Sequence, residues 1–195
     1  MNSFELYNPT KIIFGKDAYT KIAYEIPSNA RILMLYGGGS IRSNGVYDAV
    51  KEQLQHHALF EFEGVEPNPS VQTLQRAIHI VKKEKIDYLL AVGGGSVIDG
   101  TKFIAAAALY DGEPWDILEK RIRIEKALPI ATVLTLPATG SENNSGAVIT
   151  NLETHEKLGM GGVALFPKVS FLNPEVVASI PTRQLRNGVV DAFTH

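Results

Sequence analysis

The last residues of the sequence contain two side chains that could bind a metal ion. Asp191 and His195 are four positions apart, so in a helix both would lie on one face, one turn apart. A carboxylate oxygen and an imidazole nitrogen held in this way can bind one divalent cation. The same spacing also allows an ordinary Asp–His pair on a helix surface. Because a catalytic metal usually takes at least three ligands from the protein, these two residues do not complete a site.

Two glycine-rich turns have the composition of a phosphate site. Gly37-Gly38-Gly39-Ser40 and Gly93-Gly94-Gly95-Ser96 each follow an apolar run. Glycine lets a ligand approach the backbone closely, and a helix that begins after the turn presents free N–H groups and a partial positive charge. Either turn alone could be a tight turn without a ligand. The two together favour a nucleotide, although neither has the G-x-G-x-x-G spacing of the usual dinucleotide fingerprint.

Two further segments offer side chains to such a ligand. Asp99 follows the second glycine turn, and we expect it in the first turn of the next helix. There it could cap the helix or fix the loop by accepting backbone N–H bonds. Residues 135–142 contribute three hydroxyls in a segment bent by proline and glycine. Such loops hydrogen-bond ribose and phosphate oxygens, or only themselves.

Apolar runs alternate with amphipathic stretches and predict the elements that position these residues. Strands are expected at 31–36, 88–92 and 130–136, and helices at 46–54, 71–81 and 98–109. Ser70 is the expected N-cap of the second of these helices. The β-α-β-α order predicts an α/β fold, with a parallel sheet and helices on both faces. In an open sheet of this kind, ligands bind beyond the carboxyl ends of the strands, where both glycine turns would lie.

Three segments fall outside this order. Residues 4–14 alternate like an edge strand or hairpin, and residues 147–160 are expected to form two strands joined by a polar turn. From Pro181 the pattern is helical up to the last residue, without a C-cap. We therefore expect an α/β domain over 1–180, and over 181–195 the start of a helical domain that a longer protein would complete.

Size, charge and composition exclude several classes of protein. A chain of 195 residues can bury a core in one domain. The net charge of −2 argues against nucleic-acid binding, and the absence of cysteine excludes disulfides and thiolate metal sites. The N-terminus lacks the features of a signal peptide, and the apolar runs are too short to span a bilayer. We expect a cytoplasmic protein that binds neither nucleic acid nor membranes.

Three motifs together resemble those of the iron-containing (group III) alcohol dehydrogenases. They are GGGSVIDGTK at 93–102, the hydroxyl-rich loop that ends in TGSE at 139–142, and GVVDAFTH at 188–195. The segments 7–15 and 67–69 agree with this family, and the nearest branch is similar to NADP-dependent butanol dehydrogenases and broad-range aldehyde reductases. The resemblance implies an α/β nucleotide domain followed by an all-helical domain that holds the metal. This chain would cover the first domain and the opening helix of the second.

The resemblance also implies roles in cofactor binding. The second glycine turn would hold the pyrophosphate through Gly94, Gly95 and Ser96, and Asp99 would lie beside the nicotinamide half. Four more residues would meet other parts of the cofactor: Thr135 and Thr139 its oxygens, Asn68 the adenosine half, and Lys157 a ribose or phosphate.

The metal ligands are likewise implied by the resemblance. Asp191 and His195 match the first two ligands of a divalent iron or zinc ion, and two further histidines would lie beyond residue 195. The remaining histidines match no ligand motif, and we expect them at the surface: His56, His57, His79 and His155.

The first glycine turn favours NADP over NAD. NAD binders usually place an acid near the end of an early strand, where it bonds the ribose hydroxyls and repels a 2′-phosphate. NAD-preferring relatives carry an aspartate near Gly38. The segment 37–44 has no acid, and it offers Ser40, Arg42 and Ser43 instead. We therefore expect Gly37–Ser40 to bind NADP(H).

The expected activity of the parent protein is hydride transfer between the nicotinamide and a primary alcohol or aldehyde, assisted by the metal. We expect the 195-residue chain to be inactive alone. Its final helix would expose Val189, Val190 and Phe193, or bury them against a second copy in a homodimer. Two alternatives stay open: an enzyme of the glycerol dehydrogenase or dehydroquinate synthase type, and a nucleotide-binding module without catalysis. The TGSE loop and the VVDAFTH ending favour the alcohol dehydrogenase over the first alternative.

Overall fold

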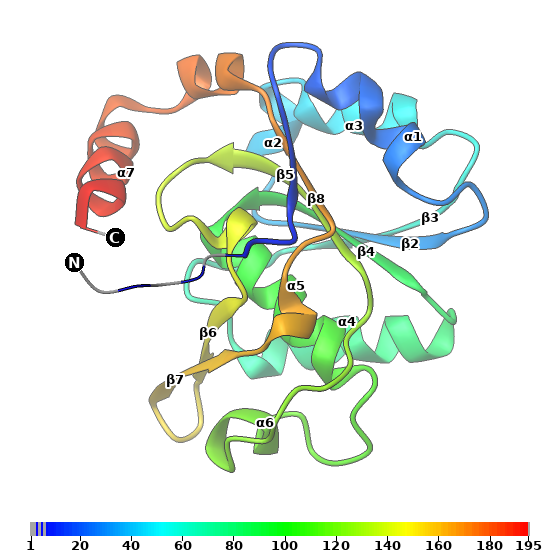
Figure 1. Ribbon diagram of the computed structural model, residues 1–195, viewed down its shortest axis with the longest axis vertical. Coiled ribbons are helices and arrows are strands. Elements are labelled where there is room, and N and C mark those ends of the chain that lie inside the picture. Colours follow the sequence, from blue (N-terminus) through cyan, green and yellow to red (C-terminus); the bar gives the residue numbers. More distant parts are fainter. Residues whose placement is uncertain (1–2, 4, 6, 195) are drawn as a thin grey trace.

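The computed structural model describes residue 3, residue 5 and residues 7–194, and its centre is a parallel sheet (Figure 1). Six strands lie in the order β1-β8-β5-β4-β2-β3, and every neighbouring pair is parallel. The strands are β1 (Lys11–Phe14), β2 (Arg31–Tyr36), β3 (Ala58–Glu63), β4 (Tyr88–Gly94), β5 (Ile130–Leu136) and β8 (Val169–Leu172). The α/β fold that the sequence predicts is therefore confirmed.

Helices cover both faces of the sheet, as expected. In Figure 1, α1 and α3 lie on one side and α4 and α5 on the other. The helices are α1 (Ile22–Glu25), α2 (Ser40–Ser43), α3 (Val46–Gln53), α4 (Val71–Lys83), α5 (Gly95–Ala107), α6 (Asp116–Glu119) and α7 (Thr182–Thr194). Short 3-10 turns lie at η1 (Ala18–Lys21), η2 (Ser141–Asn143), η3 (Val163–Leu165) and η4 (Pro174–Ser179).

The alternation of side chains along the strands divides the core into two layers. In β2, Leu33 and Leu35 pack with α4 and α5, whereas Ile32 and Met34 pack with α1 and α3. Successive side chains of a strand point to opposite faces of the sheet. Because both faces are covered, the central strands are apolar at nearly every position, which is why they are recognisable in the sequence.

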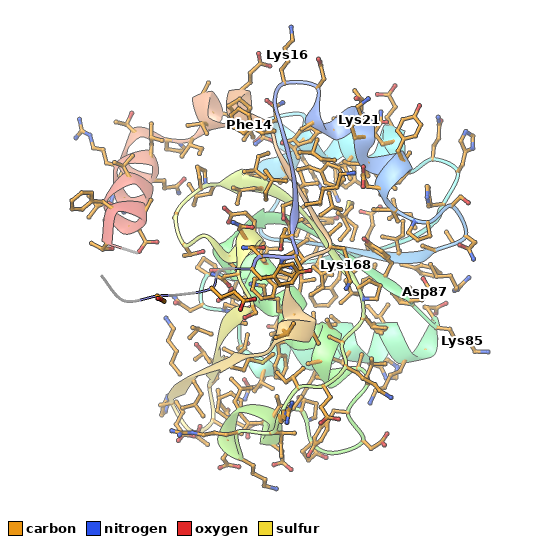
Figure 2. The ribbon with its side chains drawn as sticks, viewed as in Figure 1. Phe14, Lys16, Lys21, Lys85, Asp87 and Lys168 are labelled. Carbon is orange, nitrogen blue, oxygen red and sulfur yellow. The ribbon has the colours of Figure 1, made fainter. Side chains whose placement is uncertain are left out.

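The turns at the amino ends of the strands are polar and lie away from the glycine turns. Asp87 Oδ1 accepts a hydrogen bond of 2.8 Å from the backbone N–H of Arg31, so it ties the start of β4 to the start of β2. Figure 2 shows Asp87 and Lys85 together at the edge of the molecule where β4 begins. The carboxyl ends of β2 and β4, where the glycine turns lie, are at the opposite edge of the sheet.

Two strands of the sheet were not predicted, and one helix begins earlier than predicted. Strands β3 and β8 were not predicted, because β3 carries two acids and β8 has only four residues. Helix α5 begins at Gly95 rather than at Ile98. Of the two alternatives for residues 4–14, the edge strand is confirmed: β1 lies at the edge of the sheet beside β8, and the described part of this segment forms no hairpin.

Several other local predictions are confirmed. Residues 147–160 form the antiparallel hairpin of β6 (Gly146–Asn151) and β7 (Glu156–Gly161). Ser70 caps α4, since its side chain accepts a bond from the backbone N–H of Thr73. Three of the four histidines are exposed. The expectation for His57 is wrong, because its two ring nitrogens are buried and without hydrogen-bond partners among the described residues.

Helix α7 contacts the rest of the chain through a glycine. Gly188 is the residue of this helix that is buried, and a methyl group added to it would lie 2.8 Å from the carbonyl oxygen of Pro137. The apolar residues Val189, Val190 and Phe193 are 64%, 63% and 90% exposed. They are therefore exposed in the single chain, and their burial in a homodimer stays a prediction. Among the described residues, no helix has the length and apolar character needed to cross a membrane.

Two buried tyrosines of the α1–α3 layer give a test of this core. The Tyr19 hydroxyl has no partner among the described residues, whereas the Tyr36 hydroxyl donates to Glu61 over 3.0 Å and accepts from Arg42 over 2.7 Å. We expect Tyr19→Phe to raise the free energy of unfolding by about 1 kcal/mol at neutral pH and Tyr36→Phe to lower it by about 1–3 kcal/mol. Urea denaturation measures both, and equal losses in the two variants would contradict the assignment.

The same tyrosines predict how stability depends on pH. Burial raises the pKa of Tyr19 and of Tyr36 from 10.0 to about 12. Their contribution is therefore complete below pH 10 and is lost as the pH rises through about 12, because the unfolded chain loses these protons first. Each Phe variant should be less sensitive to alkaline pH than the natural chain.

Candidate cofactor-binding site

The second glycine turn joins β4 to α5 without an intervening loop. Strand β4 ends at Gly94 and α5 begins at Gly95, at the carboxyl edge of the sheet. The N-cap is Gly94, and because glycine has no side chain, no side-chain bond caps the helix. The first N–H groups of a 13-residue helix therefore point out of the sheet edge, where they can meet a phosphate.

The packing around this turn by itself requires glycine at positions 93 and 95. A methyl group at Gly93 would lie 2.6 Å from Val97 Cγ2, and one at Gly95 would lie 2.5 Å from Thr139 Oγ1. Both distances are shorter than real contacts allow. From the sequence, these glycines are attributed to the close approach of a ligand. In the structure, Val97 and Thr139 leave no room for a larger residue at these positions.

A pocket of about 720 Å³ opens beside the start of α5, within the range of roughly 300–1,000 Å³ typical of small-molecule sites. Its other walls come from the β6–β7 hairpin and from the segment at and after α6, including Val148, Met160 and Arg121. Six of the residues predicted to bind the cofactor line it: Asn68, Gly95, Ser96, Asp99, Thr139 and Lys157.

Three of these residues join separate elements at the pocket. Lys157 Nζ, from β7, donates to Asn68 Oδ1 over 2.7 Å. The backbone N–H of Asn68 donates to Ser96 Oγ, in the first turn of α5, over 3.3 Å. Asn68 has a positive φ of 55°, a conformation that asparagine tolerates better than most residues. Asn68 thus contacts a cation through its side chain and the first turn of a helix through its backbone, and both a cation and a helix N-terminus favour anions.

Asp99 fixes the loop and does not cap its own helix. Because α5 begins at Gly95, Asp99 lies beyond the first turn, and the predicted first-turn position is wrong. Its carboxylate accepts a 2.6 Å bond from Ser141 Oγ and a 2.9 Å bond from the backbone N–H of Val148. Burial raises the pKa of Asp99, and these two bonds and the nearby Lys102 oppose that shift.

Lys102 is a residue of the site that sequence reasoning missed. It is fully buried, and its Nζ lies 2.7 Å from Ser141 O, 2.9 Å from Ser141 Oγ, 2.9 Å from Asn144 Oδ1 and 2.8 Å from Gly146 O. Burial lowers the pKa of this lysine to about 8, against the opposing charges of Asp99 and Glu142. The available signal was a lysine three positions after Asp99 on an apolar helix, a spacing that puts both on one face.

The first glycine turn is next to the pocket but does not line it. It follows β2, which pairs with β4, and a methyl group at Gly37 would lie 3.9 Å from Val97 Cγ2. Gly39 has a φ of +93°, which a larger residue would adopt only with strain. The predicted contacts outside the pocket lining are Gly37, Gly38, Gly39, Ser40, Gly94 and Thr135.

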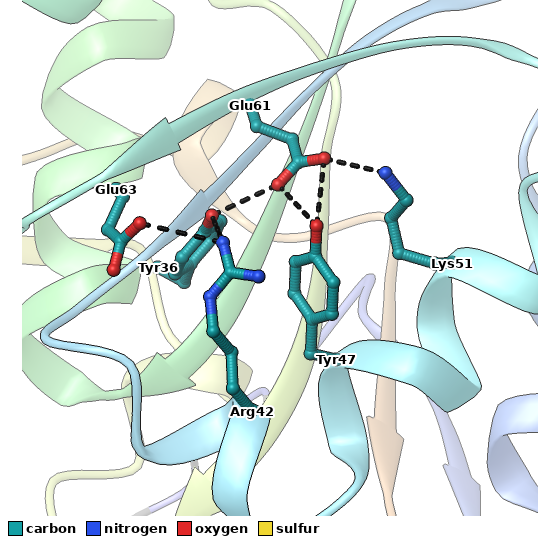
Figure 3. A network of polar contacts seen from close by, with 6 residues as sticks. All are labelled: Tyr36, Arg42, Tyr47, Lys51, Glu61 and Glu63. Carbon is teal, nitrogen blue, oxygen red and sulfur yellow. Dashed lines mark hydrogen bonds and ion pairs between the residues drawn. The ribbon is translucent and has the colours of Figure 1, made fainter.

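Glu63 is the second residue that sequence reasoning missed. It ends β3, the strand beside β2, and its Oε1 lies 3.7 Å from where a methyl group at Gly39 would be. Its Oε2 lies 3.5 Å from Arg42 Nη2 (Figure 3). The segment 37–44 has no acid of its own, but the fold brings one to it. Without β3 in the predicted sheet, this acid could not be located.

The predicted metal ligands are only partly described. Asp191 lies on α7 and is half-buried, and His195 lies outside the described residues. Within the described part of the chain, no three His, Cys, Asp or Glu side chains gather as a metal site would need. The pairing of Asp191 with His195 on a metal therefore stays a prediction.

Residues 9–174 match the family model described as iron-containing alcohol dehydrogenase. The chain belongs to this family. The resemblance seen in the three sequence motifs is thus confirmed, over most of the chain rather than at the motifs alone.

Relatives of this iron-containing alcohol dehydrogenase chain match it along its whole length. It is 48% identical to the NADPH-dependent aldehyde reductase YqhD of Escherichia coli and 50% identical to the probable NADH-dependent butanol dehydrogenase 1 of Bacillus subtilis, covering 100% of this chain and 51% of each relative. The crystal structure of NADH-dependent butanol dehydrogenase A from Thermotoga maritima superposes with a TM-score of 0.96 at 48% identity, over 100% of this chain and 50% of that one. The chain therefore spans about half the length of these family members.

The buried lysine gives a test of how the pocket is held. We expect Lys102→Met to lower the free energy of unfolding by about 2–4 kcal/mol, because several buried oxygens lose their donor. The control Lys120→Met removes an exposed pair with Asp116 and should cost less than about 1 kcal/mol. Equal losses of unfolding free energy in the two variants would show that the contacts of Lys102 do not stabilise the structure.

A second test asks whether the start of α5 binds phosphate. Thr139→Ala leaves ordinary contact distance, 3.4 Å, to a methyl group at position 95, so Gly95→Ala should fold in that background. We expect the double variant to bind NADPH about tenfold more weakly than Thr139→Ala alone, because the added methyl keeps the pyrophosphate from the backbone. Fluorescence titration measures the dissociation constant of each variant. Identical values for the double variant and for Thr139→Ala would show that the phosphate does not bind at the start of α5.

Proposed function

We propose that the chain forms the cofactor-binding part of an NADP(H)-dependent and metal-dependent alcohol dehydrogenase or aldehyde reductase. The observation that carries this proposal is the pocket at the start of α5, lined by six residues that the family pattern assigns to the cofactor. The reaction would transfer a hydride between the nicotinamide and a primary alcohol or aldehyde. The printed names of the relatives, an aldehyde reductase and butanol dehydrogenases, support this substrate class.

The pyrophosphate would lie against the N-terminus of α5. Gly95 and Ser96 would offer backbone N–H groups and a hydroxyl, and Gly94 would let the phosphate approach the turn. Lys157 and Arg121, both in the pocket lining, supply positive charge for a doubly charged pyrophosphate. Thr139 and Thr135 would donate to other oxygens of the cofactor. Asn68, already bonded to Lys157, would contact the adenosine half.

The nicotinamide would lie toward Asp99 and the hairpin. The Asp99 carboxylate is held by Ser141 and Val148, so it can orient a donor such as a carboxamide N–H without moving. The nicotinamide itself supplies the hydride, and the protein supplies its position. The adenosine ribose would lie at the first glycine turn, Gly37–Ser40, where Arg42 favours the 2′-phosphate of NADP(H).

The metal would be held in part by Asp191 and His195. A divalent iron or zinc ion suits both oxygen and imidazole ligands, and when bound it would polarise the oxygen of the alcohol or aldehyde. Two residues do not fill its coordination sphere, so further ligands must come from outside the described residues. We propose on this ground that the 195-residue chain binds the cofactor but does not complete the reaction.

NADPH oxidation with butanal tests the proposed function. We expect this chain to bind NADPH in a fluorescence titration but to show no turnover, even with added iron or zinc. A longer form that supplies two more histidines should be active, and Asp191→Ala in it should lower the rate at least about a hundredfold, because a ligand of the Lewis acid is lost. An absence of NADPH binding, or metal-dependent turnover by the 195 residues alone, would contradict the proposal.

A further inference from the structure

Arg42 is a charged residue outside the pocket lining, close to the first glycine turn. Its side chain is 46% exposed, yet three groups hold its guanidinium. The guanidinium carbon lies 4.1 Å from the centre of the Tyr47 ring and 5.4 Å from that of Tyr36, and Nη2 donates to the Tyr36 hydroxyl over 2.7 Å. An exposed arginine usually keeps its rotamer freedom, so this one is unusually well oriented.

The two tyrosines are themselves fixed by Glu61. The Tyr36 hydroxyl donates to Glu61 over 3.0 Å and the Tyr47 hydroxyl over 2.9 Å, while Lys51 Nζ donates to it over 2.7 Å (Figure 3). Lys51 balances the charge of Glu61. Because Lys51 already neutralises Glu61, the positive charge of Arg42 is balanced by a different residue.

That residue is Glu63. Arg42 Nη2 lies 3.5 Å from Glu63 Oε2, and both side chains are about half exposed. An ion pair of this kind contributes roughly 0–1 kcal/mol, so a ligand can separate it at little cost. The other carboxylate oxygen of Glu63 lies beside Gly39 in the first glycine turn. Arg42 and Glu63 thus both lie beside the first glycine turn, where the proposed function places the adenosine ribose.

We propose that the Arg42–Glu63 pair sets the preference of this chain between NADPH and NADH, a step that rests on the proposed function. A 2′-phosphate draws Arg42 away from Glu63 and forms charge-assisted bonds with the oriented guanidinium. The free 2′-hydroxyl of NADH instead donates to Glu63, as in other dinucleotide sites, and Arg42 keeps its ion pair. Glu63 therefore weakens NADPH binding and strengthens NADH binding, whereas Arg42 strengthens NADPH binding and has little effect on NADH.

Fluorescence titration of the 195-residue chain with both cofactors tests the pair. We expect Glu63→Gln to tighten NADPH binding about threefold or more and to weaken NADH binding, and Arg42→Gln to weaken NADPH binding about tenfold while changing NADH binding less than about twofold. Arg42→Lys keeps the charge but not the planar fork, so it should recover only part of the NADPH affinity. Gly38→Asp, which has open space for a side chain, should favour NADH as an added acid.

Matched controls separate a local effect from a change in net charge. Glu25→Gln and Lys11→Gln alter an exposed ion pair between α1 and β1 and should leave the ratio of the two dissociation constants unchanged. If the natural chain binds neither cofactor, the proposed function fails and this inference with it. If it binds them but Arg42→Gln and Glu63→Gln leave the ratio unchanged, only the role of the pair is overturned.

Discussion

The structure depends on how one buried ammonium group is satisfied. Lys102 has no exposed surface, and a charge taken out of water is stable only with close polar partners. Its partners belong to η2, to the following turn at Asn144 and to the start of β6. Satisfying this one group therefore fixes the position of three segments relative to α5. Those segments are the ones that face the open N-terminus of the helix.

The pocket follows from this arrangement. Asp99, one helical turn before Lys102, accepts bonds from the same loop and hairpin, so a carboxylate and an ammonium hold both segments from one helix face. The hairpin in turn brings Lys157 to Asn68. The N-terminus of α5, where we propose that a phosphate binds, thus acquires walls from parts of the chain that are distant in sequence. In this chain, the segment 93–102 therefore contributes Asp99 and Lys102, which hold the pocket walls, as well as its glycines to the turn.

The proposed coenzyme preference depends on a few side chains rather than on the overall fold. Relatives named for NADPH and for NADH are 48% and 50% identical to this chain, so the overall fold does not distinguish them. The first glycine turn receives its charged groups from two elements, Arg42 from α2 and Glu63 from β3. A weak exposed ion pair at such a place can be separated by a phosphate or kept beside a hydroxyl. In the proposed role of this pair, few residues are enough to alter the choice between the two cofactors.

The sequence by itself determined the features that local rules control. The sequence predicted the apolar runs of β2 and β4, the glycines that end them and the Ser70 cap, because each depends on neighbours in the chain. Strand β8 was not predicted, because four residues between two turns carry no clear period. The bonds from Lys102 to Ser141 and the approach of Glu63 to Gly39 were decided only by the tertiary structure. The physical reason is that both contacts depend on which strands pair and on where a hairpin packs, which no local pattern records.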